Sequence, residues 1–171
     1  MLHIIKTQTD CNTATKALLE NNDVSHVIYI YAHGSDKEDL YDVLKTDDNS
    51  SFIFIDSLSN AIESAMSRGK NVYLIANSCY WNLKYDRGIT TPTISFGPDE
   101  ATRIPYRSEY IEGKLANLPD KIEKSVFLAW VKILQKDYQK HATTWDVHDE
   151  NGNIRKVKEF RIIQSETPMP I

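Results

Sequence analysis

The sequence is poor in cysteine and has no long hydrophobic run. Two cysteines in 171 residues, Cys11 and Cys79, are too few for a disulfide framework and favour a reducing compartment. No apolar stretch approaches the length needed to cross a membrane. The stretch from residue 1 to 6 lacks the charged and long apolar segments of a secretory signal. We therefore expect a cytoplasmic protein that does not associate with membranes.

Basic clusters, metal-ligand spacings and phosphate loops are missing as well. The net charge is −4, and the only compact basic run, residues 155–158, alternates like the solvent face of a strand. This pattern disfavours nucleic-acid binding. No cysteine or histidine pair has the spacing of a metal site, so we expect no metal. The absence of a glycine-rich phosphate loop disfavours nucleotide binding.

The remaining composition is that of an ordinary globular domain, with 41% hydrophobic and 26% charged residues. The length suits one domain with a sizeable core. No repeat, linker or low-complexity segment divides the chain. We predict a single domain over residues 1–165, followed by a loose tail over 166–171.

Two short apolar runs have the same organisation and dominate the sequence. Residues 72–76 are rich in β-branched and aromatic side chains, which favours a buried strand, and Cys79 follows that strand. Residues 27–32 form a second such run, and His33 and Gly34 follow it. Open α/β sheets place reactive groups at the carboxyl ends of their strands. The sequence therefore predicts that histidine and cysteine share one edge of a sheet.

The rest of the chain predicts an α/β fold, a three-layer αβα sandwich with a mainly parallel central sheet and small β-hairpins. The strands are expected over residues 2–7, 26–32, 72–76 and 93–96, and hairpins over 40–55 and 143–163. A helical turn over 38–45 is an alternative to the first hairpin. The helices are expected over 13–21 (capped by Asp10 or Asn12), over 57–68 (capped by Ser57), within 106–115 and from 119.

The helix from residue 119 has the most regular pattern. Asp120 with Glu123 resembles a capping box. An apolar stripe at helical spacing predicts one buried face, made of Ile122, Val126, Phe127, Trp130, Ile133 and Leu134. The histidines other than His33 are expected at the surface or at strand edges, namely His3, His26, His141 and His148.

A cysteine beside a histidine is a known chemical pair. A thiol attacks as the thiolate, so it needs a nearby base, and histidine accepts a proton near neutral pH. The N–H groups of Gly34 and Cys79 offer donors for a developing oxyanion, and Gly34 has no Cβ to obstruct a substrate carbonyl. The pair therefore predicts nucleophilic catalysis without a cofactor.

With these motifs the sequence resembles the caspase-like cysteine peptidases, a group that includes caspases, metacaspases, clostripain-like enzymes and CHAT domains. The shared layout is a strand ending in His33-Gly34, a hairpin, a helix, and a strand ending in Cys79. The separation of the two residues is close to the roughly 50 residues typical of caspases. The resemblance implies that His33 is the general base, Cys79 the nucleophile and Gly34 part of the oxyanion hole. It also implies a protein or peptide substrate and a regulatory partner or activator.

Three positions near Cys79 depart from that family. Tyr80 and Trp81 stand where many members have small residues, and Asn77 stands where several branches have an acid that binds a basic P1 side chain. These three residues are the candidate substrate contacts, although Tyr80 and Trp81 suit core packing equally well.

Two other functions stay open. A catalytically inactive scaffold of the same fold is one, because Tyr80 and Trp81 are bulky enough to fill the cleft. A doubly wound ligand-binding domain is the other, in which His33 and Cys79 have no catalytic role. Ser78 is a poor alternative nucleophile, because it lacks the flanking glycines of a nucleophile elbow.

Overall fold

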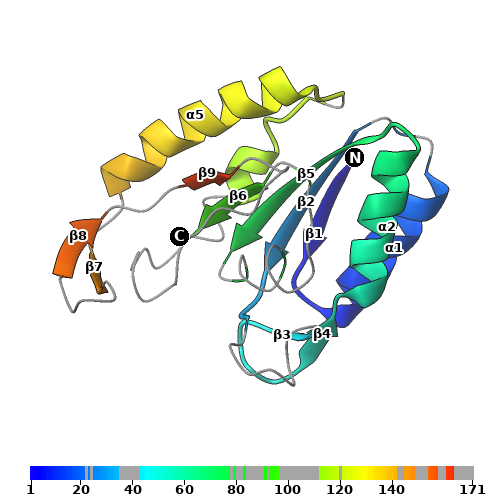
Figure 1. The fold of residues 1–171 in the computed structure, drawn as a ribbon, viewed down its shortest axis with the longest axis horizontal. Coiled ribbons are helices and arrows are strands. Elements are labelled where there is room, and N and C mark those ends of the chain that lie inside the picture. Colours follow the sequence, from blue (N-terminus) through cyan, green and yellow to red (C-terminus); the bar gives the residue numbers. More distant parts are fainter. Residues whose placement is uncertain are drawn as a thin grey trace.

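The computed structural model describes residues 1–21, 23, 25–34, 43–77, 79, 83, 91, 93–96, 112–119, 121–141, 145–148, 154–157 and 161–163. Within these residues the chain forms an α/β fold with one five-stranded sheet and two small hairpins (Figure 1). The predicted α/β class and the predominance of parallel pairing are confirmed.

The main sheet has the strand order β1-β2-β5-β6-β9. Its members are β1 (Leu2–Ile5), β2 (Ser25–Tyr31), β5 (Asn71–Asn77), β6 (Thr93–Phe96) and β9 (Arg161–Ile163). The pairs β1-β2, β2-β5 and β5-β6 are parallel, and β9 pairs antiparallel with β6. The sequence pattern did not separate β9 from the strand before it.

The two hairpins fall where the sequence predicts them. One pairs β3 (Val43–Lys45) with β4 (Phe52–Phe54), and the other pairs β7 (Trp145–His148) with β8 (Ile154–Val157). Because β3 is a strand, the alternative helical turn is wrong over residues 43–45. In Figure 1, β3 and β4 lie beyond the carboxyl ends of β2 and β5.

Helix α1 (Gln8–Glu20) begins five residues before the predicted start. Thr7, and not Asp10 or Asn12, is its N-cap. The Thr7 hydroxyl accepts a hydrogen bond from the N–H of Asp10, and the Asp10 carboxylate accepts one from the N–H of Thr7. This reciprocal capping box satisfies two N–H groups of the first turn, so the helix extends back to Gln8.

Helix α2 (Asp56–Ser67) matches the predicted range, but its predicted cap is wrong. Ile55 occupies the N-cap position and makes no side-chain cap hydrogen bond, while Ser57 lies inside the first turn. Leu58, Ile62 and Ala65 are buried and lie on one face of the helix. Burial of this face therefore stabilises the helix without a cap.

The core lies on both faces of the sheet. On one face, α1 and α2 cover Ile28, Ile30 and Leu74 (Figure 1). On the other face, Tyr29 and Ile75 share a second buried cluster with residues from later in the chain, which include Leu115, Ile122 and Phe127. Alternate residues of β2 and β5 thus belong to opposite clusters, which is the arrangement of strands buried on both faces.

Helix α5 (Lys124–His141) begins later than predicted, and Ile122 precedes it. Asp120, which the sequence analysis expects in a capping box with Glu123, lies outside the described residues. Phe127 is fully buried and stacks on Tyr73 at 4.6 Å between ring centroids. Val126 and Ile133, however, are 39% and 65% exposed, so the stripe is narrower than predicted.

The expectation of surface histidines is wrong for two of them. His3 and His26 are 6% and 0% exposed, and the Nε2 of His3 lies 3.0 Å from the Nδ1 of His26. Their rings stack at 5.3 Å between centroids. The side chains of His141 and His148 lie outside the described part of the chain.

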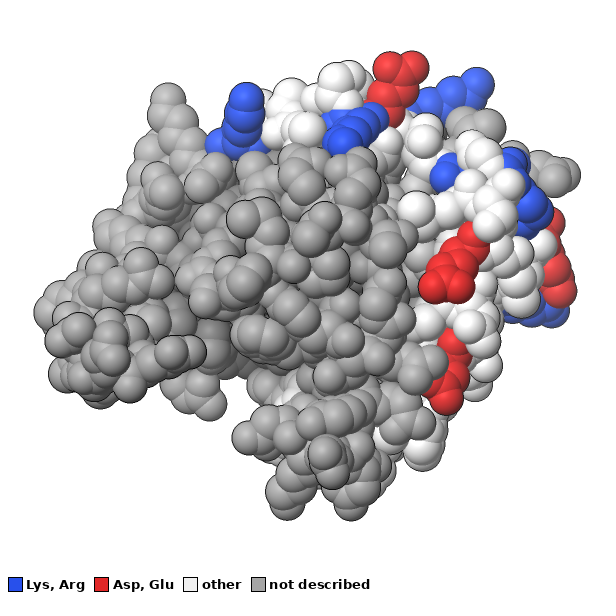
Figure 2. Space-filling view, viewed as in Figure 1, with Lys and Arg blue, Asp and Glu red and all other residues white. Residues whose placement is uncertain are grey.

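The surface of the described residues carries charges of both signs. Figure 2 shows Lys and Arg interspersed with Asp and Glu on the described part of the face in view. Among the described helices, none is long and apolar enough to cross a membrane.

Candidate active site

The ends of β2 and β5 lie next to each other at the carboxyl edge of the sheet. The two strands are parallel, and Tyr31 is paired with Asn77. The N–H of Ala32 still donates to the carbonyl of Asn77, at 3.4 Å. His33 and Cys79 follow two residues beyond that last pair, where neighbouring strands are about 4.8 Å apart. His33 and Cys79 therefore follow the ends of two adjacent strands, at the same level of the sheet edge.

The thiol of Cys79 points into the core. Cys79 is 1% exposed and belongs to the cluster under α1 and α2. Its Sγ donates to the carbonyl of Ile30 at 3.8 Å. Burial raises the pKa of the thiol from 9.0 to about 12, although backbone hydrogen bonds from Asn77 and Ala32 act in the opposite direction. In this conformation the sulfur is protonated at neutral pH.

The backbone N–H of Leu83 donates to the Cys79 carbonyl at 3.3 Å. Leu83 is fully buried in the same cluster as Cys79. The side chain of Leu83 therefore helps to hold the cysteine against the core.

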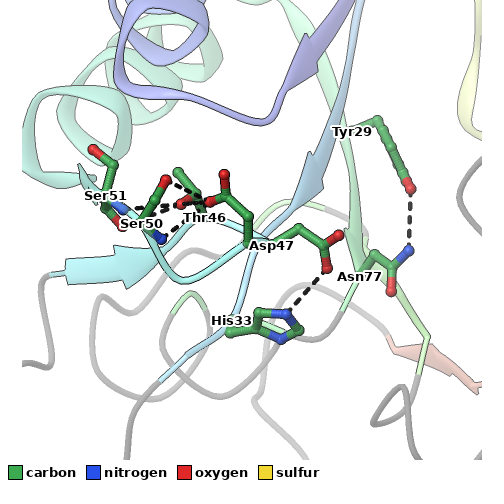
Figure 3. Close-up of polar contacts among 8 residues, drawn as sticks. Tyr29, His33, Thr46, Asp47, Ser50, Ser51 and Asn77 are labelled. Carbon is green, nitrogen blue, oxygen red and sulfur yellow. Dashed lines mark hydrogen bonds and ion pairs between the residues drawn. The ribbon is translucent and has the colours of Figure 1, made fainter.

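His33 is fixed by the β3-β4 hairpin. Its N–H donates to the Lys45 carbonyl, and the N–H of Lys45 donates to the His33 carbonyl, both at 2.8 Å. The ring Nε2 lies 3.2 Å from Oδ1 of Asp47. The two side chains are 30% and 52% exposed. Figure 3 shows the imidazole turned towards the Asp47 carboxylate.

A hydrogen-bond network closes the turn after β3, in which Asp47 lies. The Asp48 carboxylate accepts from the hydroxyls of Thr46 and Ser50, both at 2.7 Å, and from the N–H of Ser50 at 3.0 Å. These bonds hold the pKa of Asp48 at about 2. Thr46 and Ser51 are joined through their backbones at 3.1 Å. The turn is thus closed by Asp48, and the Asp47 side chain faces His33 (Figure 3).

The other predicted site residues have different placements. Gly34 is partly exposed beside His33. Asn77 is fully buried, and its Nδ2 donates to the Tyr29 hydroxyl at 3.0 Å on the sheet face opposite the Cys79 cluster. In this conformation its amide supports the sheet edge. Tyr80 and Trp81 lie outside the described residues.

Asp47 is a polar partner of His33 that the sequence analysis missed. Asp47 falls within the predicted hairpin over 40–55, in a stretch whose composition is typical of turns and gives no sign of a contact with His33. The predicted hairpin is the signal that could have indicated this contact. A hairpin that follows a histidine can place an acidic residue of its turn beside the imidazole ring of that histidine. Among the described residues, no three His, Cys, Asp or Glu side chains gather as metal ligands would.

Fold and site together define an α/β protein with a histidine–carboxylate pair and a buried cysteine at the carboxyl edge of a mainly parallel sheet. Comparison of the chain with family models, with curated proteins and with solved structures found no match.

Proposed function

We propose that the protein is a caspase-like cysteine endopeptidase that uses His33 and Cys79. The observation that supports this most is the pairing of Tyr31 with Asn77, which brings the ends of β2 and β5 together at one point of the sheet edge. His33 and Cys79 follow these two strand ends. We also propose the three-layer αβα arrangement of that family. The support is burial on both sheet faces, by α1 and α2 on one and by the region of Phe127 on the other.

The reaction proposed is acyl transfer through a thioester. His33 accepts the proton of the Cys79 thiol, and the sulfur attacks the scissile carbonyl carbon. The backbone N–H groups of Gly34 and Cys79 donate to the oxyanion. The carbon–nitrogen bond then breaks, and His33 returns the proton to the leaving amine. Water hydrolyses the thioester, which restores the thiol and releases the new carboxylate.

The burial of Cys79 means that this reaction requires an opened state. A protonated sulfur in contact with the Ile30 carbonyl cannot reach a substrate, so the described conformation is the resting form in this proposal. Rotation of the cysteine side chain out of the core, favoured by a substrate or a protein activator, would place the sulfur at the sheet edge. Activity is then set by the population of the open state.

A non-catalytic domain of the same fold is the second candidate, and the same burial favours it. A cysteine that is 1% exposed within an apolar cluster is a normal core residue. A doubly wound ligand-binding domain is less favoured. Among the described strands the sheet order rises steadily along the chain, without the reversal at which such folds bind cofactors.

Cleavage of a peptide library separates the candidates. The wild-type protein should cut a subset of peptides, and mass spectrometry of the products gives the preferred sequences. Cys79→Ala should abolish cleavage. Cys11→Ala is the matched control, because Cys11 is equally buried in the same cluster but lies on α1. Cleavage that survives in Cys79→Ala would exclude the proposed nucleophile, and a wild-type protein inert to every peptide would favour the non-catalytic candidate.

A further inference from the structure

We propose that Asp47 is the positioning residue of this site and selects the ring nitrogen of His33 that acts as the base. The proposal rests on the peptidase function proposed above. It follows from two contacts of His33: its backbone is paired with Lys45, and its Nε2 lies 3.2 Å from the Asp47 carboxylate.

The contact with Asp47 determines the tautomer of the His33 ring. A carboxylate only accepts hydrogen bonds, so the nitrogen that faces Asp47 must carry the proton. Asp47 therefore stabilises the Nε2–H form of the neutral imidazole. In that form the basic lone pair is on Nδ1, the nitrogen on the other side of the ring. In catalytic triads, too, a carboxylate fixes both the tautomer and the orientation of the histidine that acts as the base.

The β3-β4 hairpin connects His33 and Asp47 through backbone hydrogen bonds. His33 and Lys45 exchange two backbone hydrogen bonds of 2.8 Å, and Asp47 is two residues beyond Lys45. The turn that follows is closed by the Asp48 network, in which Thr46 and Ser50 participate. Both members of the His33–Asp47 pair are thus attached to one hairpin. The hairpin would keep His33 and the Asp47 carboxylate together when the Cys79 side chain rotates out of the core.

Solvent limits the strength of the interaction between His33 and Asp47. Both side chains are partly exposed, at 30% and 52%, so solvent screens the attraction between them. The pair becomes an ion pair when His33 takes up the Cys79 proton, and exposed ion pairs change an equilibrium by about 2–5-fold. We therefore expect loss of Asp47 to slow the reaction of Cys79 about 2–5-fold and to leave the fold intact.

Two measurements test the assignment. In protein labelled with ¹⁵N-histidine, the ring nitrogen shifts of His33 at pH 8 report the tautomer. The wild-type protein should show the Nε2–H form, and Asp47→Ala should shift towards the mixture of tautomers of a free imidazole. Asp48→Asn is the control, because it removes a charge from the same turn and keeps an acceptor for Thr46 and Ser50. It should resemble the wild type, and Asp47→Glu should restore part of the wild-type signal.

The second measurement is the rate of Cys79 alkylation by iodoacetamide at pH 7. It should fall about 2–5-fold in Asp47→Ala relative to Asp48→Asn. An unchanged tautomer in Asp47→Ala overturns the assignment, and so does a changed tautomer with an unchanged alkylation rate. The variant His33→Ala distinguishes these results from failure of the proposed function. If His33→Ala slows alkylation while Asp47→Ala does not, the dyad stands without Asp47; if neither does, both proposals fall.

Discussion

The buried histidine pair predicts a specific loss of stability in mild acid. His3 and His26 lie 3.0 Å apart between ring nitrogens, and the Nε2 of His26 is buried without a hydrogen-bond partner among the described residues. Burial, the neighbouring His26 and the amine of Met1 lower the pKa of His3 from 6.5 to about 4, against a small opposing effect of Asp23. Burial also lowers the pKa of His26.

The sign and size of the effect follow from proton linkage. The unfolded chain binds a proton at His3 before the folded chain does, so the stability is complete above about pH 6.5 and falls as the pH approaches 4. Between pH 7 and pH 5, His3 alone should remove about 2 kcal/mol of the free energy of unfolding. His26 acts in the same direction.

The test compares urea unfolding of the wild type and of the double variant His3→Gln/His26→Asn at both pH values. Glutamine carries its amide near the position of Nε2 and asparagine near that of Nδ1, so the hydrogen bond can form without titration. Because each protein is compared with itself, the fixed cost of the substitutions cancels. The variant should lose about 2 kcal/mol less than the wild type. An equal loss in both proteins would refute the role of the pair.

Two further predictions concern the helices. Thr7→Ala should lower the free energy of unfolding by about 1 kcal/mol, because it removes the capping box of α1, whereas Ser57→Ala in the uncapped α2 should have an effect within about 0.5 kcal/mol. Phe127→Ala should lower the free energy of unfolding by about 3–5 kcal/mol, since the Phe127 ring is fully buried against Tyr73. Val126→Ala, at an exposed neighbouring position, should lower it far less. Urea unfolding measures the two helix-capping variants and these two variants.

The sequence predicts the elements well where the apolar pattern is local. β2 and β5 are continuous apolar runs, and their burial on both faces explains why they were recognised. The start of α1 was missed although its signal was present, since Thr7 and Asp10 have the spacing of a capping box. The sequence analysis instead predicts Asp10 or Asn12 as the cap.

Other features depend on partners far along the chain. His3 is buried because His26, 23 residues away, supplies a ring nitrogen. The segment before α5 is held by Ser25, whose Oγ donates to the carbonyl of Ile122 and accepts from its N–H, both at 3.0 Å. Such contacts leave no periodic signal in the sequence. The inward turn of the Cys79 side chain is of the same kind, because it depends on the Ile30 carbonyl and on Leu83.

The central claim is that His33 and Cys79 form a catalytic dyad. The most direct test is the pH dependence of Cys79 alkylation by iodoacetamide, measured in a protein that has His33 and in the variant His33→Ala. Cys11→Ser is present in both proteins, so that Cys79 is the only thiol. If the dyad exists, the wild-type cysteine reacts through its open state at a rate that stays measurable below pH 7, and His33→Ala removes that reactivity. If Cys79 is a core residue, the rates of the two proteins coincide. Both then rise about tenfold per pH unit, as expected for a thiol far below its pKa.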